Sequence, residues 1–250
     1  MKDRETEEWR ISQEAAGYAD FHPSGNPRSP LLVALHGYGG NKKSMARLVG
    51  PALPQGFALA SLQGPHPHLI RSEDRSRPLG FGFGWITNWK PEESIALHHA
   101  AIDAIRARAA AEGGVDPASV FLLGYSQSVA LNFRYAFTFP EKVRGIVAVA
   151  GGIPGDWDEE GKYRDAPVDV LYLAGRTDEF YPPDRIEGNA RALGRRGANV
   201  TVEVLETGHD FPTEAMPLVR RWLEERVPSS RPAGLSSSPP PSPTGEGARG

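Results

Sequence analysis

Cysteine is absent from this 250-residue chain. Without thiols there can be no disulfide, no thiolate metal site and no cysteine nucleophile. An excess of positive charge is also absent, because 28 Lys and Arg stand against 31 Asp and Glu, for a formal net charge of −3. This balance, together with the lack of a basic cluster, argues against nucleic acid as a partner.

Long apolar runs are missing as well. No stretch approaches the roughly 20 apolar residues of a membrane-spanning helix, so we expect no membrane span. The first residues, Met1 to Glu5, are polar and charged, unlike a signal peptide. These absences favour a cytoplasmic location. The hydrophobic content of 39% is enough for one sizeable core in a chain of this length.

The chain divides into three parts by composition. Residues 1–30 are a polar lead-in that could add edge strands, and residues 228–250 are a Ser-, Pro- and Gly-rich tail that we expect to be disordered. Residues 31–227 alternate strand-like and helix-like runs, which predicts an α/β domain with a mostly parallel sheet covered by helices on both faces. The expected strands are 31–35, 57–62, 120–123, 145–150, 168–174 and 200–205, and the expected helices are 41–49, 92–111, 126–139, 184–193 and 213–226.

The segment Gly124-Tyr125-Ser126-Gln127-Ser128 stands between an apolar strand and a helix-like stretch. A serine flanked by small residues at alternate positions, between strand and helix, is typical of a nucleophile elbow. Such a turn is sharp and strained, and it pushes the serine hydroxyl out of the sheet edge. We therefore interpret Ser126 as a catalytic nucleophile. The alternative is that Ser126 only caps the following helix.

An acid and a histidine follow in the order that this architecture requires. Asp178 comes shortly after the predicted strand 168–174, and His209 comes after the strand 200–205. Of the seven histidines, His209 is the one in this position. Glu179, Asp184 and Asp210 are nearby carboxylates, and we favour Asp178 because it falls four residues after the strand ends and precedes a helix.

A glycine-rich loop follows the first predicted strand. The strand 31–35 runs directly into His36-Gly37-Tyr38-Gly39-Gly40, and glycines let a backbone approach a substrate closely. The backbone N–H groups of Tyr38 and Gln127 are therefore the expected donors of an oxyanion hole. We expect His36 to be a structural hydrogen-bonding residue and not a catalytic base.

With these loops in view, the chain resembles an α/β-hydrolase of the phospholipase/carboxylesterase group, which includes the acyl-protein thioesterases. The resemblance spans about residues 31–212. It rests on Leu35 to Gly39, Gly124 to Gln127, Gly145 to Val149 with Gly152-Ile153-Pro154, Gly175 with Asp178 and Pro182, and Gly208-His209.

The resemblance implies an α/β-hydrolase fold and a serine hydrolase that cleaves small to medium carboxylic esters or thioesters through an acyl-enzyme. It implies no cofactor and no metal. Two positions depart from the family pattern: Ser128 stands where glycine is usual, and Tyr181 stands where a small β-branched residue usually precedes the proline. The first departure places a side chain where the strand and the helix on either side of Ser126 pack closely. Neither departure removes a catalytic group.

The segment 64–91 is long for a connection, and long loops are often functional. It holds four aromatic residues among glycines. We expect them to line or cover an acyl or aryl pocket near Ser126, and the alternative is that they pack as a small satellite core. These residues are Phe81, Phe83, Trp85 and Trp89.

Other functions fit the same residues. A Ser-His-Asp triad could serve a peptidase, an acyltransferase or a polyester depolymerase, because fold and triad do not fix the substrate. A non-catalytic binding module with this fold is a further alternative, although every catalytic position holds a competent residue. The sequence leaves the physiological substrate and the oligomeric state open.

Overall fold

The computed structural model describes residues 7–70 and 80–227. Its centre is a seven-stranded sheet in the order β1-β3-β2-β6-β7-β8-β9. β1 pairs antiparallel with β3, and every other neighbouring pair is parallel. Each of the six expected strands is present, and β6 begins earlier than expected. The strands are β1 (Ala19–His22), β2 (Ser29–Leu35), β3 (Ala58–Leu62), β6 (Val115–Tyr125), β7 (Gly145–Val149), β8 (Asp169–Gly175) and β9 (Asn199–Leu205).

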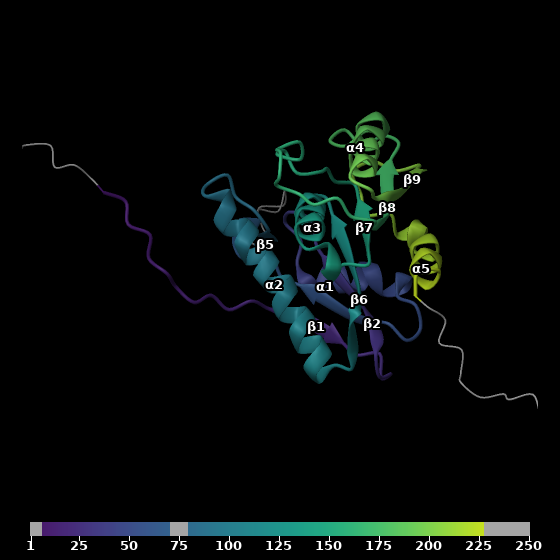
Figure 1. The fold of residues 1–250 in the computed structure, drawn as a ribbon, viewed down its shortest axis with the longest axis horizontal. Coiled ribbons are helices and arrows are strands. Elements are labelled where there is room, and N and C mark those ends of the chain that lie inside the picture. Colours follow the sequence, from purple (N-terminus) through teal and green to yellow (C-terminus); the bar gives the residue numbers. More distant parts are fainter. Residues whose placement is uncertain (1–6, 71–79, 228–250) are drawn as a thin grey trace, which may run out of the picture.

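Helices cover both faces of this sheet (Figure 1). α2 (Pro91–Glu112), α3 (Gln127–Thr138) and α4 (Pro183–Arg195) pack their apolar residues into one core layer. α1 (Lys42–Val49) and α5 (Met216–Glu224) pack into the layer on the other face. Because β2, β6, β7 and β8 are covered on both sides, their residues form nearly continuous buried runs. This is the α/β architecture that the sequence predicts.

The last predicted helix, 213–226, is divided in the structure. Thr213–Ala215 is a 3₁₀ turn, and α5 begins only at Met216. Pro217 explains the division, because proline lacks the N–H that a helix interior needs and is accommodated in the first turn. Two further 3₁₀ turns, Gly50–Ala52 and Pro140–Lys142, follow α1 and α3.

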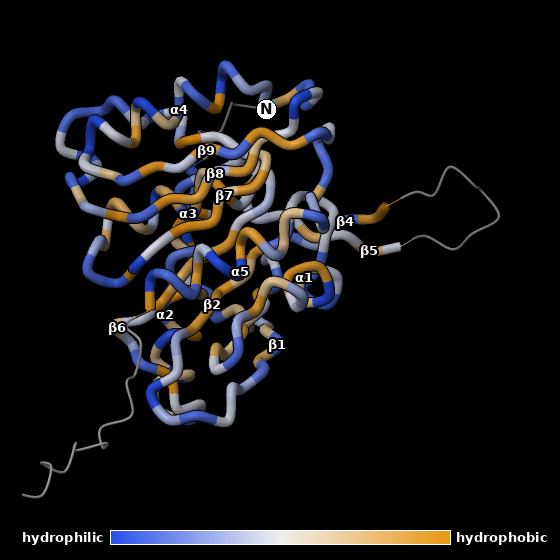
Figure 2. The backbone as a smooth tube through the Cα atoms, turned by 90° about the vertical axis from the view of Figure 1, so that its right-hand side faces the viewer, coloured by the Kyte–Doolittle hydropathy of each residue, from blue (hydrophilic) through white to orange (hydrophobic). Residues whose placement is uncertain are grey.

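The segment 64–91 is more ordered than the loop that the sequence suggests. It contains an antiparallel pair, β4 (His66–Ile70) and β5 (Gly80–Gly84), which projects from the body of the molecule as an arm (Figure 2). Every second residue of β5 is glycine, which is a poor strand former, so the sequence pattern predicts a loop and not a strand. Gly82 is needed here, since a Cβ at this position would lie 2.8 Å from the Gly39 Cα. Residues 71–79 lie outside the described part of the chain.

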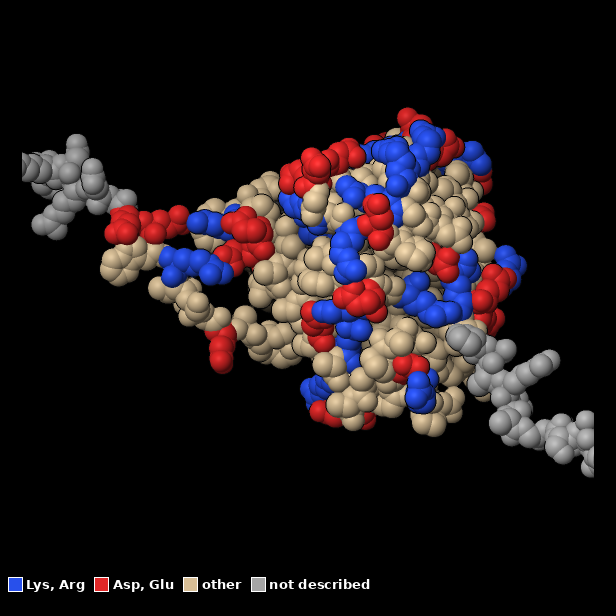
Figure 3. Space-filling view, viewed as in Figure 1, with Lys and Arg blue, Asp and Glu red and all other residues tan. Residues whose placement is uncertain are grey.

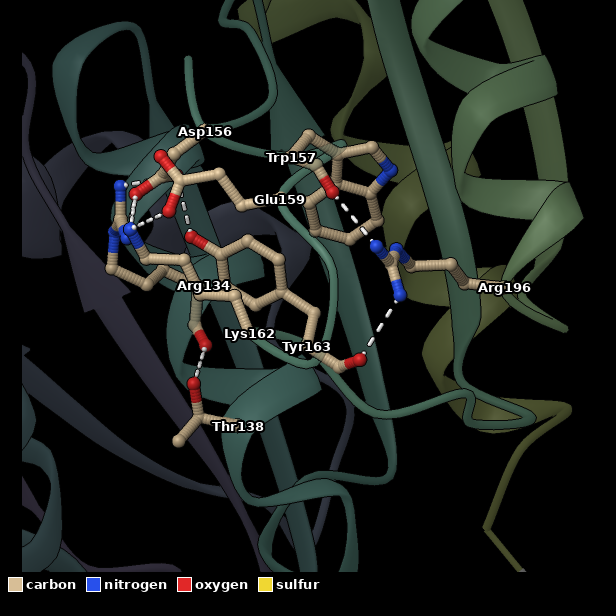
Figure 4. Close-up of polar contacts among 8 residues, drawn as sticks. All are labelled: Arg134, Thr138, Asp156, Trp157, Glu159, Lys162, Tyr163 and Arg196. Atoms are coloured by element: carbon tan, nitrogen blue, oxygen red, sulfur yellow. Dashed lines mark hydrogen bonds and ion pairs between the residues drawn. The ribbon is translucent and has the colours of Figure 1, made fainter.

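The connection between β7 and β8 is fixed by a polar cluster (Figure 4). Arg134 of α3 binds Asp156 through two hydrogen bonds of 2.7 and 2.8 Å, and the Tyr163 hydroxyl donates to the same carboxylate. Arg196 donates to the backbone carbonyls of Tyr163 and Trp157. Burial alone would raise the pKa of Asp156, but its hydrogen bonds from Arg134, Lys162 and Tyr163 hold that pKa well below its usual range. The connection is thereby tied to the helix that begins at the elbow.

The surface carries both signs of charge. Lys and Arg are interspersed with Asp and Glu on the face shown in Figure 3. Among the helices of the described residues, none has the length and apolar character needed to cross a membrane. The Ser- and Pro-rich tail, residues 228–250, for which we expect disorder, lies outside the described residues.

A buried histidine makes the fold sensitive to acid. His98 of α2 is fully buried, and its Nε2–H donates to Asn132 Oδ1 at 3.2 Å. Burial lowers the pKa of His98 to about 3, and the positive charges of His99 and Arg134 act in the same direction. In the unfolded chain a histidine has a pKa of about 6.5. As the pH falls below 6.5, the unfolded state therefore takes up a proton that the folded state excludes, and stability is lost.

We expect His98 to cost the fold about 2 kcal/mol of unfolding free energy at pH 5 relative to pH 7.5. Urea unfolding at the two pH values measures this difference. The variant His98→Gln should show a smaller loss between the two pH values, whatever its stability at pH 7.5. His22→Gln, at an exposed histidine of β1, is the matched control and should keep the wild-type loss. An unchanged pH dependence in His98→Gln would rule out this role.

Candidate active site

Ser126 occupies a sharp turn between β6 and α3. Its backbone angles are φ 53° and ψ −110°, and a positive φ of this kind is rarely adopted by non-glycine residues. The turn is held in place because the Ser126 N–H donates to the Val149 carbonyl at 2.9 Å and the Ser126 carbonyl accepts from the Val129 N–H. Hydrogen bonds to both polar backbone groups of Ser126 therefore hold the strained conformation. The geometry is that of a nucleophile elbow.

Small residues allow β6 and α3 to approach closely at this turn. A Cβ on Gly124 would lie 2.7 Å from Asn132 Nδ2 and 3.2 Å from the Val129 Cα, so any larger residue there would force α3 or its side chains to shift. Ser128, which departs from the family pattern, is fully buried. Its Oγ accepts from the Tyr125 N–H at 3.0 Å and donates to the Leu35 carbonyl at 2.9 Å. Ser128 thus fits the close packing and links the end of β2 to the end of β6.

The structure brings Ser126, His209 and Asp178 together from three loops. Ser126 Oγ lies 2.9 Å from His209 Nε2, and His209 Nδ1 lies 2.9 Å from Asp178 Oδ2. A hydrogen on Nδ1 that is donated to the carboxylate leaves Nε2 free to accept from the serine hydroxyl. The three side chains therefore form a continuous chain of hydrogen bonds in the order serine, histidine, aspartate.

Asp178 is almost completely buried, with 2% of its surface exposed. Its Oδ1 accepts from the N–H groups of Phe180 and Tyr181 at 2.8 and 2.9 Å, which leaves Oδ2 for His209. Burial alone would raise the pKa of Asp178, but the hydrogen bonds from His209, Tyr181 and Phe180 outweigh it and lower the pKa below its usual value. Asp178 is thus kept ionised beside the imidazole. The three other candidate carboxylates, Glu179, Asp184 and Asp210, are all exposed.

Three aromatic rings surround the His209 imidazole. The rings of Tyr125 and Tyr181 stack on it with centroids 5.8 and 5.9 Å away, and the ring of Phe180 meets it edge-on at 4.9 Å. The Tyr125 hydroxyl also donates to the His209 backbone carbonyl at 2.8 Å. Sequence reasoning noted Tyr181 only as a departure from the family pattern, and it gave none of the three residues a role at His209. Their positions beside Ser126 and Asp178 are the signal that could have found them.

The glycine-rich loop after β2 lies against the elbow. A Cβ on Gly37 would lie 2.8 Å from the Tyr125 ring and 3.4 Å from the Ser126 Cβ. His36 is buried and holds this loop: its Nδ1–H donates to the Gly37 carbonyl at 2.7 Å, and its Nε2 accepts from the Gly64 N–H at 3.0 Å. Burial lowers the pKa of His36, in keeping with a neutral ring. This is the structural role that the sequence predicts for it.

The β4–β5 arm supports the same loop. The N–H of Gly39 donates to the Phe83 carbonyl at 3.0 Å, and the N–H of Phe83 donates to the Gly40 carbonyl at 3.1 Å. The Gln127 side chain, one residue after Ser126, accepts from the Trp85 N–H at 2.7 Å. β5 and the residue after it therefore bond the backbone that follows Tyr38 and the side chain of Gln127, next to both predicted oxyanion donors.

The four predicted pocket aromatics lie in different environments. Trp85 is fully buried and its indole N–H donates to the His36 carbonyl at 2.8 Å, whereas Phe83 is half-buried. Both line a cavity of about 1220 Å³ between α2 and the segment before β1, and none of the three triad residues lines it. Phe81 and Trp89 are 67% and 74% exposed. A substrate-pocket role for these four residues stays a prediction.

The described residues contain no group of three or more His, Cys, Asp or Glu side chains arranged to hold a metal ion. His66 is engaged with Ser94, whose Oγ lies 2.9 Å from the imidazole Nε2. The His68 ring stacks on the Tyr38 ring with centroids 4.4 Å apart. Around Ser126 itself, the polar side chains contact one another through hydrogen bonds.

Comparison with known proteins places these features in context. The phospholipase/carboxylesterase family model matches residues 17–226. NocK of Nocardia uniformis subsp. tsuyamanensis, whose name describes an esterase, is 27% identical over 223 residues, which make up 84% of this chain and 58% of NocK. The chain spans about half the length of the curated relatives it matches.

Solved structures show the same fold. The carboxylesterase from Mesorhizobium loti is 25% identical with a TM-score of 0.66, and the match covers 86% of this chain and 98% of that one. The carboxylesterase from Bacillus cereus is 19% identical with a TM-score of 0.67, and the match covers 85% of this chain and 96% of that one. The sheet and its covering helices are therefore those of an α/β-hydrolase.

Proposed function

The chain belongs to the phospholipase/carboxylesterase family of α/β-hydrolases, and on this basis we propose that it is a serine esterase for carboxylic esters or thioesters with small to medium acyl groups. One observation carries the proposal. Ser126 Oγ, the His209 imidazole and the Asp178 carboxylate form a chain of 2.9 Å hydrogen bonds at a strained elbow. This is the arrangement that activates a serine hydroxyl for attack on an acyl carbonyl.

Acylation follows from this geometry. His209 Nε2 takes the proton of Ser126 as the Oγ attacks the acyl carbon, and a tetrahedral oxyanion forms. Asp178 keeps the Nδ1–H tautomer in place and stabilises the imidazolium without taking the proton. The imidazolium then gives its proton to the departing alcohol or thiol, and the acyl group remains on Ser126.

The amides of Tyr38 and Gln127 are the proposed oxyanion donors. Gln127 is the first residue of α3, so its N–H is among those that a helix leaves without an intrahelical partner. The Tyr38 amide belongs to the loop that Gly37 brings against Ser126. One such donor contributes about 3 kcal/mol to transition-state stabilisation in hydrolases.

Deacylation repeats these steps with water as the nucleophile. His209 accepts a proton from the water, which attacks the acyl carbon, and the released proton returns to Ser126 as the acid product leaves. The same acyl-enzyme forms from an ester or a thioester, because only the leaving atom differs. No step uses a metal or a cofactor.

A panel of leaving groups on one acyl group tests the proposal. We expect the wild type to hydrolyse butyryl esters and thioesters, with kcat/KM well above that for the matching butyryl amide. An enzyme that prefers the amide would be a peptidase-type hydrolase instead. Failure to hydrolyse any member, together with failure to react with a fluorophosphonate, would contradict an esterase function.

A further inference from the structure

A large aromatic side chain stands exposed beside the proposed base. Phe180 lies in the turn between β8 and α4, its ring centroid is 4.9 Å from that of His209, and the two rings meet at 62°. The residue is 62% exposed. Single exposed aromatics are common on protein surfaces and need no explanation by themselves. Phe180 differs because it touches the imidazole that the reaction uses.

The backbone of Phe180 is fixed in this place. Its N–H donates to Asp178 Oδ1 at 2.8 Å, and its carbonyl accepts from Arg185 Nη1 at 2.8 Å. The next residue, Tyr181, donates its N–H to the same Asp178 oxygen, and its ring lies 4.7 Å from the Arg185 guanidinium. Both polar groups of the Phe180 backbone are thus bonded within one turn. Because the Phe180 backbone is already fixed, less conformational entropy is lost when a ligand binds to the exposed ring.

Tyr181 fills the space on another side of the imidazole. Its ring stacks on His209, and a Cβ on Gly152 would lie 2.9 Å from the Tyr181 ring. The Tyr125 ring occupies a third position and is half-buried. Of the three rings around His209, Phe180 is the exposed one. Its open surface is therefore an apolar surface next to the imidazole that a substrate can contact.

The direction of the reaction indicates which part of a substrate meets this ring. The leaving alcohol receives its proton from His209 Nε2, so the alcohol portion must pass next to the imidazole. Resting on the proposed function, we propose that Phe180 is a specificity-determining residue that binds the alcohol portion, and that the enzyme prefers esters of aryl and arylalkyl alcohols. A flat ring packs edge-on or offset against Phe180 with more stabilisation than a saturated group of similar size.

Acetate esters with different alcohols test this preference. We expect Phe180→Ala to lower kcat/KM for benzyl acetate about tenfold, and that for ethyl acetate less than about twofold. Cyclohexylmethyl acetate, which matches the benzyl ester in size but lacks the aromatic ring, should fall between the two. Phe180→Tyr keeps the ring and should restore the benzyl preference. Trp9→Ala, at a 77% exposed tryptophan of the N-terminal segment, is the matched control and should leave all rates unchanged.

Other results would overturn the inference. An equal loss for all three esters in Phe180→Ala would mean that Phe180 only supports the turn at Asp178. If the loss of kcat/KM in Phe180→Ala depended on the length of the acyl group in esters of one alcohol, Phe180 would contact the acyl portion of the substrate and not the alcohol portion. If the wild type hydrolyses esters but Phe180→Ala is unaffected, the inference fails and the proposed function stands. If the wild type hydrolyses no ester and resists a fluorophosphonate, both fail.

Discussion

Replacing Ser126 by alanine is expected to lower kcat for ester hydrolysis by about a million-fold, the cost of removing the nucleophile in a serine hydrolase. The Ser126 Oγ is the atom that His209 Nε2 contacts at 2.9 Å, and alanine leaves the base without a nucleophile to activate. The fold should persist, because alanine and serine tolerate the strained backbone of the turn about equally. Steady-state kinetics with p-nitrophenyl esters from acetate to dodecanoate measure the loss.

The matched control for this variant is Ser128→Ala. Ser128 lies in the same turn, but its hydroxyl bonds the Tyr125 N–H and the Leu35 carbonyl and does not reach His209. We expect it to lose less than about tenfold in activity, through the missing hydrogen bonds. If Ser128→Ala loses as much activity as Ser126→Ala, then any substitution in this turn lowers activity, and the loss in Ser126→Ala would not identify Ser126 as the nucleophile.

Replacing Asp178 by asparagine is expected to lower kcat about 10⁴-fold. The asparagine oxygen can still accept from the amides of Phe180 and Tyr181, so the turn keeps its shape. Its NH₂ group would then face His209 Nδ1, and the imidazole would adopt the tautomer that cannot accept the Ser126 proton. The pH dependence of kcat, together with kcat itself, measures this effect.

Two neighbouring carboxylates serve as controls for Asp178. Glu179→Gln and Asp210→Asn change exposed groups on either side of the Asp178–His209 pair and should keep most of the activity. A fully active Asp178→Asn, or an inactive Asp210→Asn, would show that the acid has been assigned to the wrong residue.

Much of this arrangement could be predicted from the sequence, because its signals are local. The strands before Ser126 and Asp178 read as continuous buried apolar runs, and the strand before His209 alternates apolar and polar residues, as an edge strand does. Parallel strands place their carboxyl ends at one edge of the sheet, so residues far apart in the chain meet there. The order of strands and loops was therefore enough to bring the three side chains together.

The supporting groups could not be predicted in the same way. The β5 strand alternates glycine with phenylalanine, and its role in holding Gly39 and Gly40 depends on a contact between distant segments. The fit of Ser128 depends on a carbonyl at Leu35, which no local pattern reveals. The position of Phe180 beside His209 depends on how the turn after β8 is bonded to Asp178 and Arg185. These are tertiary contacts, and sequence periodicity does not encode them.

The most direct test of the central claim is to locate the adduct of a fluorophosphonate on the active protein. Trypsin releases Ser126 in the peptide 109–134, which also contains Ser119 and Ser128, so fragmentation by tandem mass spectrometry distinguishes the three serines. We predict a single adduct on Ser126, formed in step with the loss of esterase activity. An adduct on another residue, or ester hydrolysis that continues with Ser126 fully modified, would contradict the account.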